Sequence, residues 1–280
     1  MCDETTFPLS RRHLGQLGAA AALAGCSGKG IAASGGKLTE SMVTIPTPDG
    51  TADAFFVHPG KGKHPAIILW PDIAGLREAK KAMARRLAGD GFAVLVVNQY
   101  YRNARAPVLQ SFAEWRTPEG QARLKPMIAA ISPEGIEHDG AAFVRWLDGQ
   151  NAVDKARGIG TGGYCMGGPF AIRTAHAASS RVRAAASFHG GSLVTDRPDS
   201  PHRLLAATKA SYLIAIARND DAKAPNDKVV LKEVAAAAGR PAEIEVYQAD
   251  HGWTVPDSPV YDAAEADRAY ARALALYRTL

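Results

Sequence analysis

The sequence predicts one α/β domain, a mostly parallel β-sheet with helices on both faces. Short, continuous apolar runs, typical of strands buried on both faces, alternate with segments whose apolar residues recur at helical spacing. No Pro- and Ser-rich linker interrupts this alternation after residue 40. With 280 residues, of which 46% are hydrophobic and 22% charged, the chain can build the large core that such a fold needs.

The first elements form a strand–helix–strand unit. A candidate strand at 54–57 precedes apolar strands at 66–70 and 92–97, and the segment between these two carries Leu76, Ala79, Met83 and Leu87 at helical spacing. The pattern continues with a helix at 133–149, a strand at about 157–163, a helix at 167–178, strands at 182–188 and 211–217, a helix at 226–238, a strand at 243–247 and a helix at 261–278. Ligands bind beyond the carboxyl ends of strands in such sheets, so functional residues are expected directly after the apolar runs.

The first 40 residues differ in composition and predict an export signal followed by a tether. Two arginines, Arg11 and Arg12, precede an uncharged, weakly apolar stretch at 14–28, and this order resembles a twin-arginine signal. The letters L-A-G-C at 23–26 resemble a lipobox, in which cleavage would leave Cys26 for lipidation. We expect residues 1–26 to be the signal, 27–40 a flexible tether and 41–280 the folded domain of an exported protein, periplasmic or membrane-anchored. The alternative is a disordered tail on a cytoplasmic enzyme.

Several partner classes are not expected. The net charge is +5, but the 33 Lys and Arg residues are spread along the chain, which argues against nucleic acid. No H-E-x-x-H motif and no other group with metal-ligand spacing occurs, so no metal is expected. Residues 158–163 contain the letters G-x-G-x-x-G, but they lie mid-chain and the next strand ends in His189 rather than an acidic residue. A dinucleotide cofactor is therefore not expected.

The segment G-Y-C-M-G at 163–167 has the form of a nucleophile elbow with Cys in place of Ser. A strand that turns abruptly into a helix strains the backbone of its apex residue, and glycines two residues away allow the strand and helix to pass closely. The helix N-terminus favours the thiolate form of a cysteine at that apex. The alternative is that Cys165 is only a small buried residue in a Gly-rich packing contact.

A reactive thiol needs a base and a group that orients the base. In elbow hydrolases the chain order is nucleophile, acid and then His, and each follows a later strand. Asp220 and Asp221 follow the strand at 211–217, and His251 follows the strand at 243–247. Asp220 is preferred as the acid because it lies three residues after the strand's last Ala. Asp221 remains the alternative acid. His189, which falls between nucleophile and acid, is interpreted as a pocket wall.

These segments together resemble the dienelactone hydrolase family, which has the α/β-hydrolase fold. The resemblance covers the chain from about residue 42 and rests on G-Y-C-M-G-G at 163–168, A-R-N-D at 217–220, D-H-G-W at 250–253, W-P-D-I-A-G-L at 70–76 and V-N-Q-Y-Y-R at 97–102. It implies hydrolysis of a small-molecule ester or lactone through an acyl-enzyme, without a cofactor. Cys165 would attack the carbonyl, His251 would act as base and Asp220 would hold the imidazole tautomer.

The resemblance also implies four substrate-binding residues. The backbone N–H groups of Ile73 and Met166 would receive the oxyanion. Asp72 would tune Cys165, and Arg102 would bind a carboxylate on the substrate. Asp72 stands where the namesake enzymes have the longer Glu, and the segment after His251 lacks their second arginine. Dienelactone itself is therefore not expected to be the substrate.

Two other functions stay open from the sequence. One is a non-catalytic exported lipoprotein that keeps the hydrolase fold for ligand binding. The other is a thiol redox protein in which Cys165 cycles through sulfenic acid, although removal of the signal would leave no second cysteine to resolve it.

Overall fold

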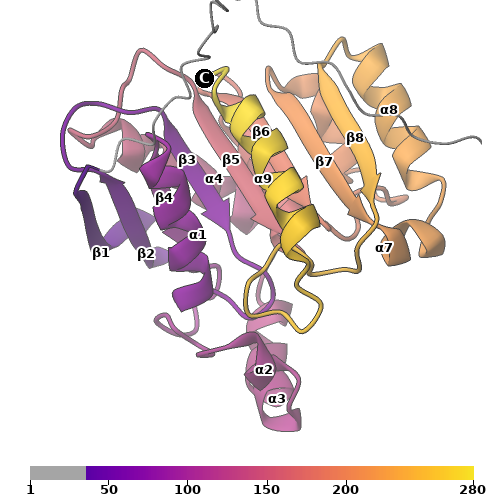
Figure 1. The fold of residues 1–280 in the computed structure, drawn as a ribbon, viewed down its shortest axis with the longest axis horizontal. Helices are drawn as coiled ribbons and strands as arrows, with labels where there is room; N and C mark the ends of the chain where they lie inside the picture. Colours follow the sequence, from indigo (N-terminus) through magenta and orange to yellow (C-terminus); the bar gives the residue numbers. More distant parts are fainter. Residues whose placement is uncertain (1–35) are drawn as a thin grey trace, which may run out of the picture. The chain divides into compact units, whose positions relative to one another are not determined.

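The computed structural model describes residues 36–280, which form an eight-stranded sheet with helices on both faces (Figure 1). The strand order is β1-β2-β4-β3-β5-β6-β7-β8, in which β1–β2 and β2–β4 pair antiparallel and the remaining pairs are parallel. The strands are β1 (Leu38–Thr47), β2 (Gly50–Pro59), β3 (Ala66–Trp70), β4 (Ala93–Val97), β5 (Ile159–Tyr164), β6 (Val182–Phe188), β7 (Ser211–Ala217) and β8 (Ala242–Tyr247). The predicted α/β fold class with a mostly parallel sheet is confirmed.

Two hydrophobic cores lie on the two faces of the sheet. Helices α1 (Glu78–Gly89) and α9 (Ala263–Tyr277) pack on one face, at the front of Figure 1. Helices α4 (Pro133–Asp148), α5 (Gly167–Ala177) and α8 (Asp227–Ala237) pack on the other. Successive residues of the central strands alternate between the two cores, because side chains of a strand point to opposite faces. This explains why strands such as β3 and β4 are apolar at every position.

The first hairpin differs from the sequence prediction. Strand β1 begins at Leu38, so the last three residues of the predicted tether belong to the sheet, and β2 is longer than the predicted strand at 54–57. The two strands pair along their whole length from Leu38↔Pro59 to Thr47↔Gly50. β1 lies at the edge and is mostly exposed, so it lacks the apolar run that marks the inner strands. The predicted signal and Cys26 lie outside the described residues.

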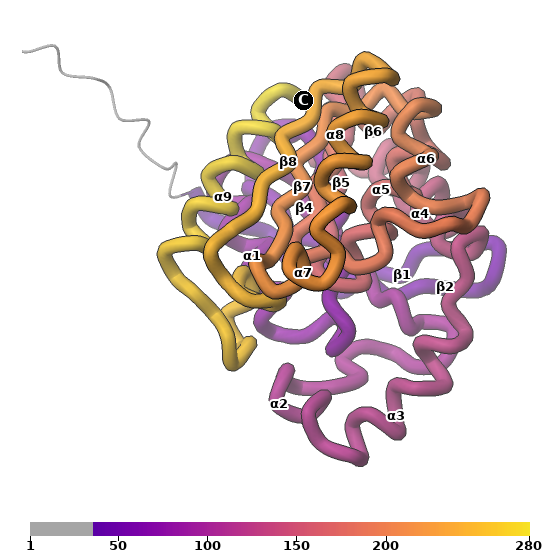
Figure 2. The backbone as a smooth tube through the Cα atoms, turned by 90° about the vertical axis from the view of Figure 1, so that its right-hand side faces the viewer, coloured from indigo at the N-terminus to yellow at the C-terminus, as the bar shows by residue number. Residues whose placement is uncertain are grey.

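An excursion between β4 and α4 was not predicted either. It contains α2 (Phe112–Trp115) and α3 (Pro118–Ala129), which lie together at the lower end of the folded domain in both backbone views (Figures 1 and 2). The side chain of Thr117 caps α3 by accepting a hydrogen bond from Gly120 N at 3.0 Å. The excursion has a small core of its own with Tyr100 and Ala74, which follow β4 and β3. It therefore covers part of the edge where the strands end. The short elements α6 (Pro201–Leu204), η1 (Leu205–Ala207) and α7 (Arg218–Lys223) complete the fold.

Candidate active site

Cys165 occupies a strained turn between β5 and α5. Its φ is +54°, in the left-handed region that side chains other than Gly rarely adopt. A Cβ at Gly163 would lie 1.8 Å from the carbonyl oxygen of Gly167, so the strand and the helix can cross here only because residue 163 is Gly. The Cys165 side chain is half-buried rather than enclosed in the core. This is the geometry of an apex residue with a partly accessible side chain, as a nucleophile elbow requires.

His251 contacts one of the two candidate acids. Its Nδ1 lies 2.5 Å from Oδ2 of Asp220, and its backbone N–H donates to Asn219 Oδ1 at 2.9 Å. Asp221 instead forms an ion pair with Lys228 at 2.6 Å. The short helix α7 separates the two carboxylates in this way, because neighbouring helical residues point in different directions. The structure therefore brings Asp220, and not Asp221, to the imidazole.

The imidazole of His251 also interacts with the Cys165 side chain. Burial would lower the pKa of His251, but the hydrogen bonds with Asp220 and Cys165 and the charges of both raise it to about 10. The carboxylate of Asp220 and the sulfur of Cys165 both favour the imidazolium. The ends of β5, β7 and β8 thus bring Cys165, Asp220 and His251 to one edge of the sheet, with the imidazole bonded to Asp220.

His189 supports the elbow through a hydrogen bond with the backbone of Cys165. Its Nδ1 accepts a hydrogen bond from Cys165 N at 3.1 Å, and its Nε2 lies 3.0 Å from Oγ1 of Thr254. Because Nδ1 is an acceptor, the proton of the neutral ring is on Nε2 and is donated to Thr254. Burial and the nearby charge of His251 lower the pKa of His189 well below 6.5, so the ring stays neutral. The ring centroids of His189 and His251 lie 4.8 Å apart, which makes His189 a wall behind the imidazole.

The loop after β3 holds the amide of Ile73 in a fixed direction. The carbonyl oxygen of Asp72 accepts hydrogen bonds from Gly75 N at 2.9 Å and from Gln99 Nε2 at 2.8 Å. The carbonyl oxygen of Ile73 accepts from the Tyr100 hydroxyl at 2.8 Å. In a trans peptide the C=O of residue 72 and the N–H of residue 73 point in opposite directions, so these bonds aim Ile73 N–H away from Gln99.

Ile73 and Met166 are linked through Tyr100. The Tyr100 hydroxyl that contacts Ile73 O also lies 3.3 Å from Sδ of Met166. A Cβ at Gly167 would lie 2.5 Å from the carbonyl oxygen of Trp70, which shows how closely the elbow packs under this loop. Within residues 36–280, neither Ile73 N nor Met166 N donates to a protein acceptor. Both amides are thus without a protein acceptor, which is the state that an oxyanion donor requires.

Asp72 is held in a buried ion cluster. Its Oδ1 lies 2.8 Å from Nη1 of Arg77 and its Oδ2 lies 2.9 Å from Nζ of Lys80. Arg77 also pairs with Asp257, at 2.7 Å, in the segment that follows His251. Burial would raise the pKa of Asp72, but the charges of Lys80 and Arg77 lower it to about 2. Both carboxylate oxygens are thus engaged, and no hydrogen bond joins them to Cys165 in the described part of the chain.

Arg102 is also engaged by carboxylates. Its Nη1 lies 2.7 Å from Oδ2 of Asp139, which is buried in α4, and its Nη2 lies 2.5 Å from Oδ2 of Asp49, in the β1–β2 turn. The guanidinium therefore links α4 to the first hairpin. These contacts occupy the donors that the sequence-based hypothesis assigned to a substrate carboxylate.

Residues 36–280 contain neither a metal-binding cluster nor a membrane-spanning helix. No group of three or more His, Cys, Asp or Glu side chains in this range could hold a metal ion. No helix in this range is long and apolar enough to cross a membrane.

Comparison with known proteins identifies the family. The sequence model described as the dienelactone hydrolase family matches residues 52–280. The chain belongs to the dienelactone hydrolase family. A Methylorubrum extorquens protein that is provisionally named carboxymethylenebutenolidase is 27% identical over 249 residues, which are 86% of this chain and 81% of the relative.

Solved structures of the family share the fold. A provisionally named dienelactone hydrolase from Klebsiella pneumoniae superposes with a TM-score of 0.75 at 20% identity, over 87% of this chain and 100% of the other. A dienelactone hydrolase-like promiscuous phosphotriesterase from metagenomic libraries gives 0.70 at 20% identity, over 87% and 98%. The chain is therefore a dienelactone hydrolase-like hydrolase with the α/β-hydrolase fold, as the sequence motifs predicted.

Proposed function

We propose that the protein hydrolyses carboxylic esters or lactones through an acyl-enzyme on Cys165, with His251 as the base and Asp220 as the group that orients it. The observation that carries this proposal is the position of His251, which bonds Asp220 through Nδ1 and interacts with Cys165 at the same time. A ligand-binding or structural role for the fold would not need an imidazole between a carboxylate and a half-buried thiol.

The proposed reaction has two halves. Because the raised pKa of His251 keeps its imidazole protonated, the thiol proton has already passed to this ring, and the Cys165 sulfur bonds to the substrate carbonyl carbon while the N–H groups of Ile73 and Met166 bind the oxyanion. The C–O bond to the leaving group then breaks, and the protonated His251 gives its proton to the departing oxygen. In the second half, the neutral His251 takes a proton from water, the hydroxide attacks the thioester carbonyl, the C–S bond breaks, and the acid product leaves while the proton on His251 restores the starting pair with Cys165.

The charges around the site support an uncharged substrate. Arg77, Lys80 and Arg102 are each paired with a carboxylate of the protein itself. Apolar side chains border the oxyanion loop instead, and Met166 packs against the core of the α2–α3 excursion together with the half-buried Trp115. We therefore propose a small neutral ester or lactone in place of a dicarboxylate-like lactone.

Hydrolysis of p-nitrophenyl acetate tests the proposal. The purified protein should release p-nitrophenol catalytically, and Cys165→Ala should reduce the rate to the background level. Alkylation of wild type with iodoacetamide should have the same effect. The matched control is Cys26→Ala, which removes a cysteine of the predicted signal and should leave turnover unchanged. Full activity in Cys165→Ala would refute the proposal, and it would leave the ligand-binding alternative.

We further propose that the protein is exported and anchored through Cys26, on the sequence pattern of residues 10–26 alone. Cell fractionation should find the wild-type chain in the membrane fraction and Cys26→Ala outside it. A cytoplasmic location of both would contradict this proposal.

A further inference from the structure

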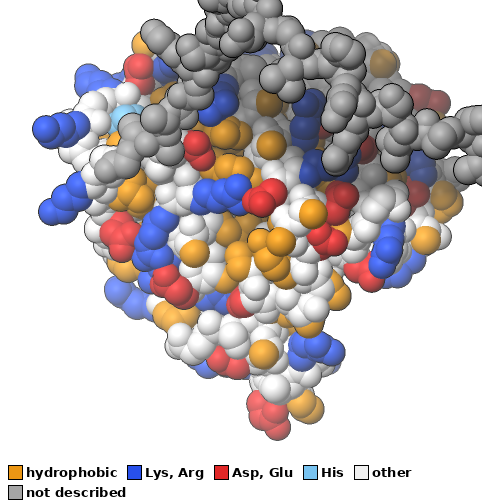
Figure 3. Space-filling model, viewed as in Figure 1, with side chains coloured by type: hydrophobic (Ala, Val, Ile, Leu, Met, Phe, Trp, Pro, Cys, Tyr) orange, Lys and Arg blue, Asp and Glu red, His pale blue; other side chains and the backbone are white. Residues whose placement is uncertain are grey.

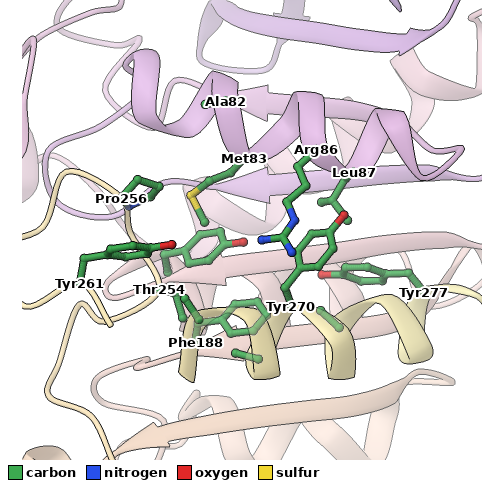
Figure 4. Close-up of a pocket in the computed structure, with 14 residues that line it drawn as sticks. Ala82, Met83, Arg86, Leu87, Phe188, Thr254, Pro256, Tyr261, Tyr270 and Tyr277 are labelled. Carbon is green, nitrogen blue, oxygen red and sulfur yellow. The ribbon is translucent and has the colours of Figure 1, made fainter. Parts of the chain in front are cut away.

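A cavity of about 150 Å³ lies between α1 and α9, apart from the candidate active site (Figure 4). Neither Cys165 nor His251 lines it. The link between the two places is Thr254, which borders the cavity and also bonds Nε2 of His189. The cavity therefore lies behind the His189 wall, on the face of the sheet that α1 and α9 cover.

Small residues on α9 leave this space open. The helix turns Ala266, Ala269 and Ala273 toward the sheet, at positions where a larger apolar side chain would fill the gap. Met83 and Leu87 of α1 lie across from them (Figure 4). The space-filling view shows hydrophobic side chains exposed on this face over α1 and α9 (Figure 3). The cavity is thus an apolar space that remains after the core has packed.

Most of the polar groups around the cavity are already paired. The Tyr270 hydroxyl donates to a carboxylate oxygen of Asp90, and the Tyr277 hydroxyl donates to the carbonyl oxygen of Thr161 at 3.1 Å. These two tyrosines therefore present mainly their rings to the cavity, together with Phe188.

The hydroxyls of Tyr164 and of the more exposed Tyr261 have no hydrogen-bond partner within residues 36–280, and that of Tyr164 is the buried one. The side chain is only 6% exposed. Nζ of Lys80 lies 4.0 Å from the ring centroid, and the ring of Phe188 stacks on it at 4.9 Å. Both faces of the ring are thereby occupied, so Tyr164 offers the cavity its hydroxyl-bearing edge. Burial raises the pKa of Tyr164, and its hydroxyl can therefore both donate and accept.

The charges at the cavity do not favour an anion. Arg86 borders it and stands over the ring of Tyr270 at 3.7 Å, but its guanidinium pairs with Asp267 at 2.8 Å. The carboxylate of Asp90, which binds Tyr270, adds a negative charge nearby. An uncharged ligand avoids the cost of burying an unpaired charge in this apolar space.

We propose that this cavity is a second binding site, and that it takes an uncharged monocyclic aromatic molecule with one hydroxyl group, of the phenol class. An apolar cavity of this size can hold a benzene ring. The hydroxyl of the ligand would exchange a hydrogen bond with that of Tyr164, while its ring would contact the tyrosine rings and Met83. The site is independent of the proposed ester hydrolysis.

Calorimetric titration with phenol tests the proposal. The full-length Cys165→Ala variant is used, so that neither turnover nor the thiol contributes to the signal. Phenol should bind saturably to this protein, and Ala269→Leu on the same background should abolish the binding by filling the cavity. Ala271→Leu is the matched control, because Ala271 lies on the exposed side of the same helix, and it should bind phenol unchanged.

A second variant separates the hydroxyl from the ring. Tyr164→Phe should weaken phenol binding about fivefold, the value of one hydrogen bond of about 1 kcal/mol, and leave toluene binding unchanged. If Ala269→Leu does not fold by circular dichroism, Ala266→Leu fills the other end of the cavity and takes its place. Absence of saturable phenol binding, or unchanged binding in the cavity-filling variant, would overturn the proposal. An equal loss of phenol and toluene in Tyr164→Phe would overturn the assigned role of the hydroxyl.

Discussion

Replacing Gln99 with Leu tests how the oxyanion amide is positioned. Gln99 is buried, and its Nε2 is one of two donors that fix the carbonyl oxygen of Asp72 and thereby the direction of Ile73 N–H. Its other polar atom, Oε1, has no partner in the described residues. Leu at this position has a similar size, loses the one hydrogen bond and removes the unpaired oxygen.

The expected effect is mainly on the chemical step. Loss of an oxyanion donor costs about 100-fold to 1000-fold in kcat, which is the upper limit here because Gly75 N still holds the carbonyl. A shift of this amide by a fraction of an ångström should lower kcat by about tenfold to 100-fold. The free energy of unfolding should fall by no more than about 1 kcal/mol, since one hydrogen bond is lost and one unsatisfied atom is removed.

Steady-state hydrolysis of p-nitrophenyl acetate measures the effect, with thermal unfolding in parallel. We expect kcat to fall while KM stays near the wild-type value, because the amide binds the transition state rather than the ground state. Tyr100→Phe, which removes the bond to Ile73 O, should act in the same direction. Wild-type kcat in a stably folded Gln99→Leu protein would refute this account of the loop.

Three further predictions concern the triad and the buried ions. Asp220→Asn should lower kcat/KM on the order of 1000-fold, because the imidazole loses its orienting carboxylate, whereas Asp221→Asn should leave kcat/KM near wild type. The pKa of His251 near 10 predicts that kcat/KM falls as pH rises through about 10, where the proton for the leaving group is lost, and Asp220→Asn should move this limb to lower pH. Arg77→Met should lower the free energy of unfolding by about 3 kcal/mol in urea denaturation, because Asp72 would lose one of its two buried partners.

The predictions for the two acids and for Arg77 each have a matched control. For the acids, a larger loss in the Asp221 variant than in the Asp220 variant would reverse the assignment. Because folding raises the pKa of His251, protonation of this residue also stabilises the folded state. This stabilisation should be fully present below pH 6.5, the usual pKa of His, and should be lost as pH rises through about 10. For Arg77, the control is Arg272→Met, which breaks an exposed pair with Glu243 and should cost less than about 1 kcal/mol. Equal costs for the two arginines would contradict the role of burial.

The sequence predicted the inner sheet because its strands are buried on both faces and so read as continuous apolar runs. The helices at 226–238 and 261–278 correspond to α8 and α9 within two residues at each end. β1 escaped prediction because it is an exposed edge strand whose pairing, not its own composition, makes it a strand. α3 does carry a helix-start signal in the sequence, the cap Thr117 followed by Pro118 and Glu119.

For the site, the sequence predicted that Cys165 and His251 lie at one edge of the sheet, because each follows a predicted strand. The choice between Asp220 and Asp221 depends on how α7 turns, and spacing alone does not define that. The ion pairs of Asp72 and the hydrogen bond from Gln99 to the carbonyl oxygen of Asp72 are likewise tertiary contacts. No local pattern joins residues 72 and 99, and they meet only because β3 and β4 are neighbours in the sheet.

Kinetics of the Cys165→Ala/His251→Ala double variant test the central claim most directly. Residues that act as one unit show losses that do not multiply. The account predicts that each single variant falls close to the background rate with p-nitrophenyl acetate, and that the double variant is no slower than either. Losses that multiply in the double variant would show that the two side chains act separately, and substantial turnover in either single variant would exclude that side chain from the reaction.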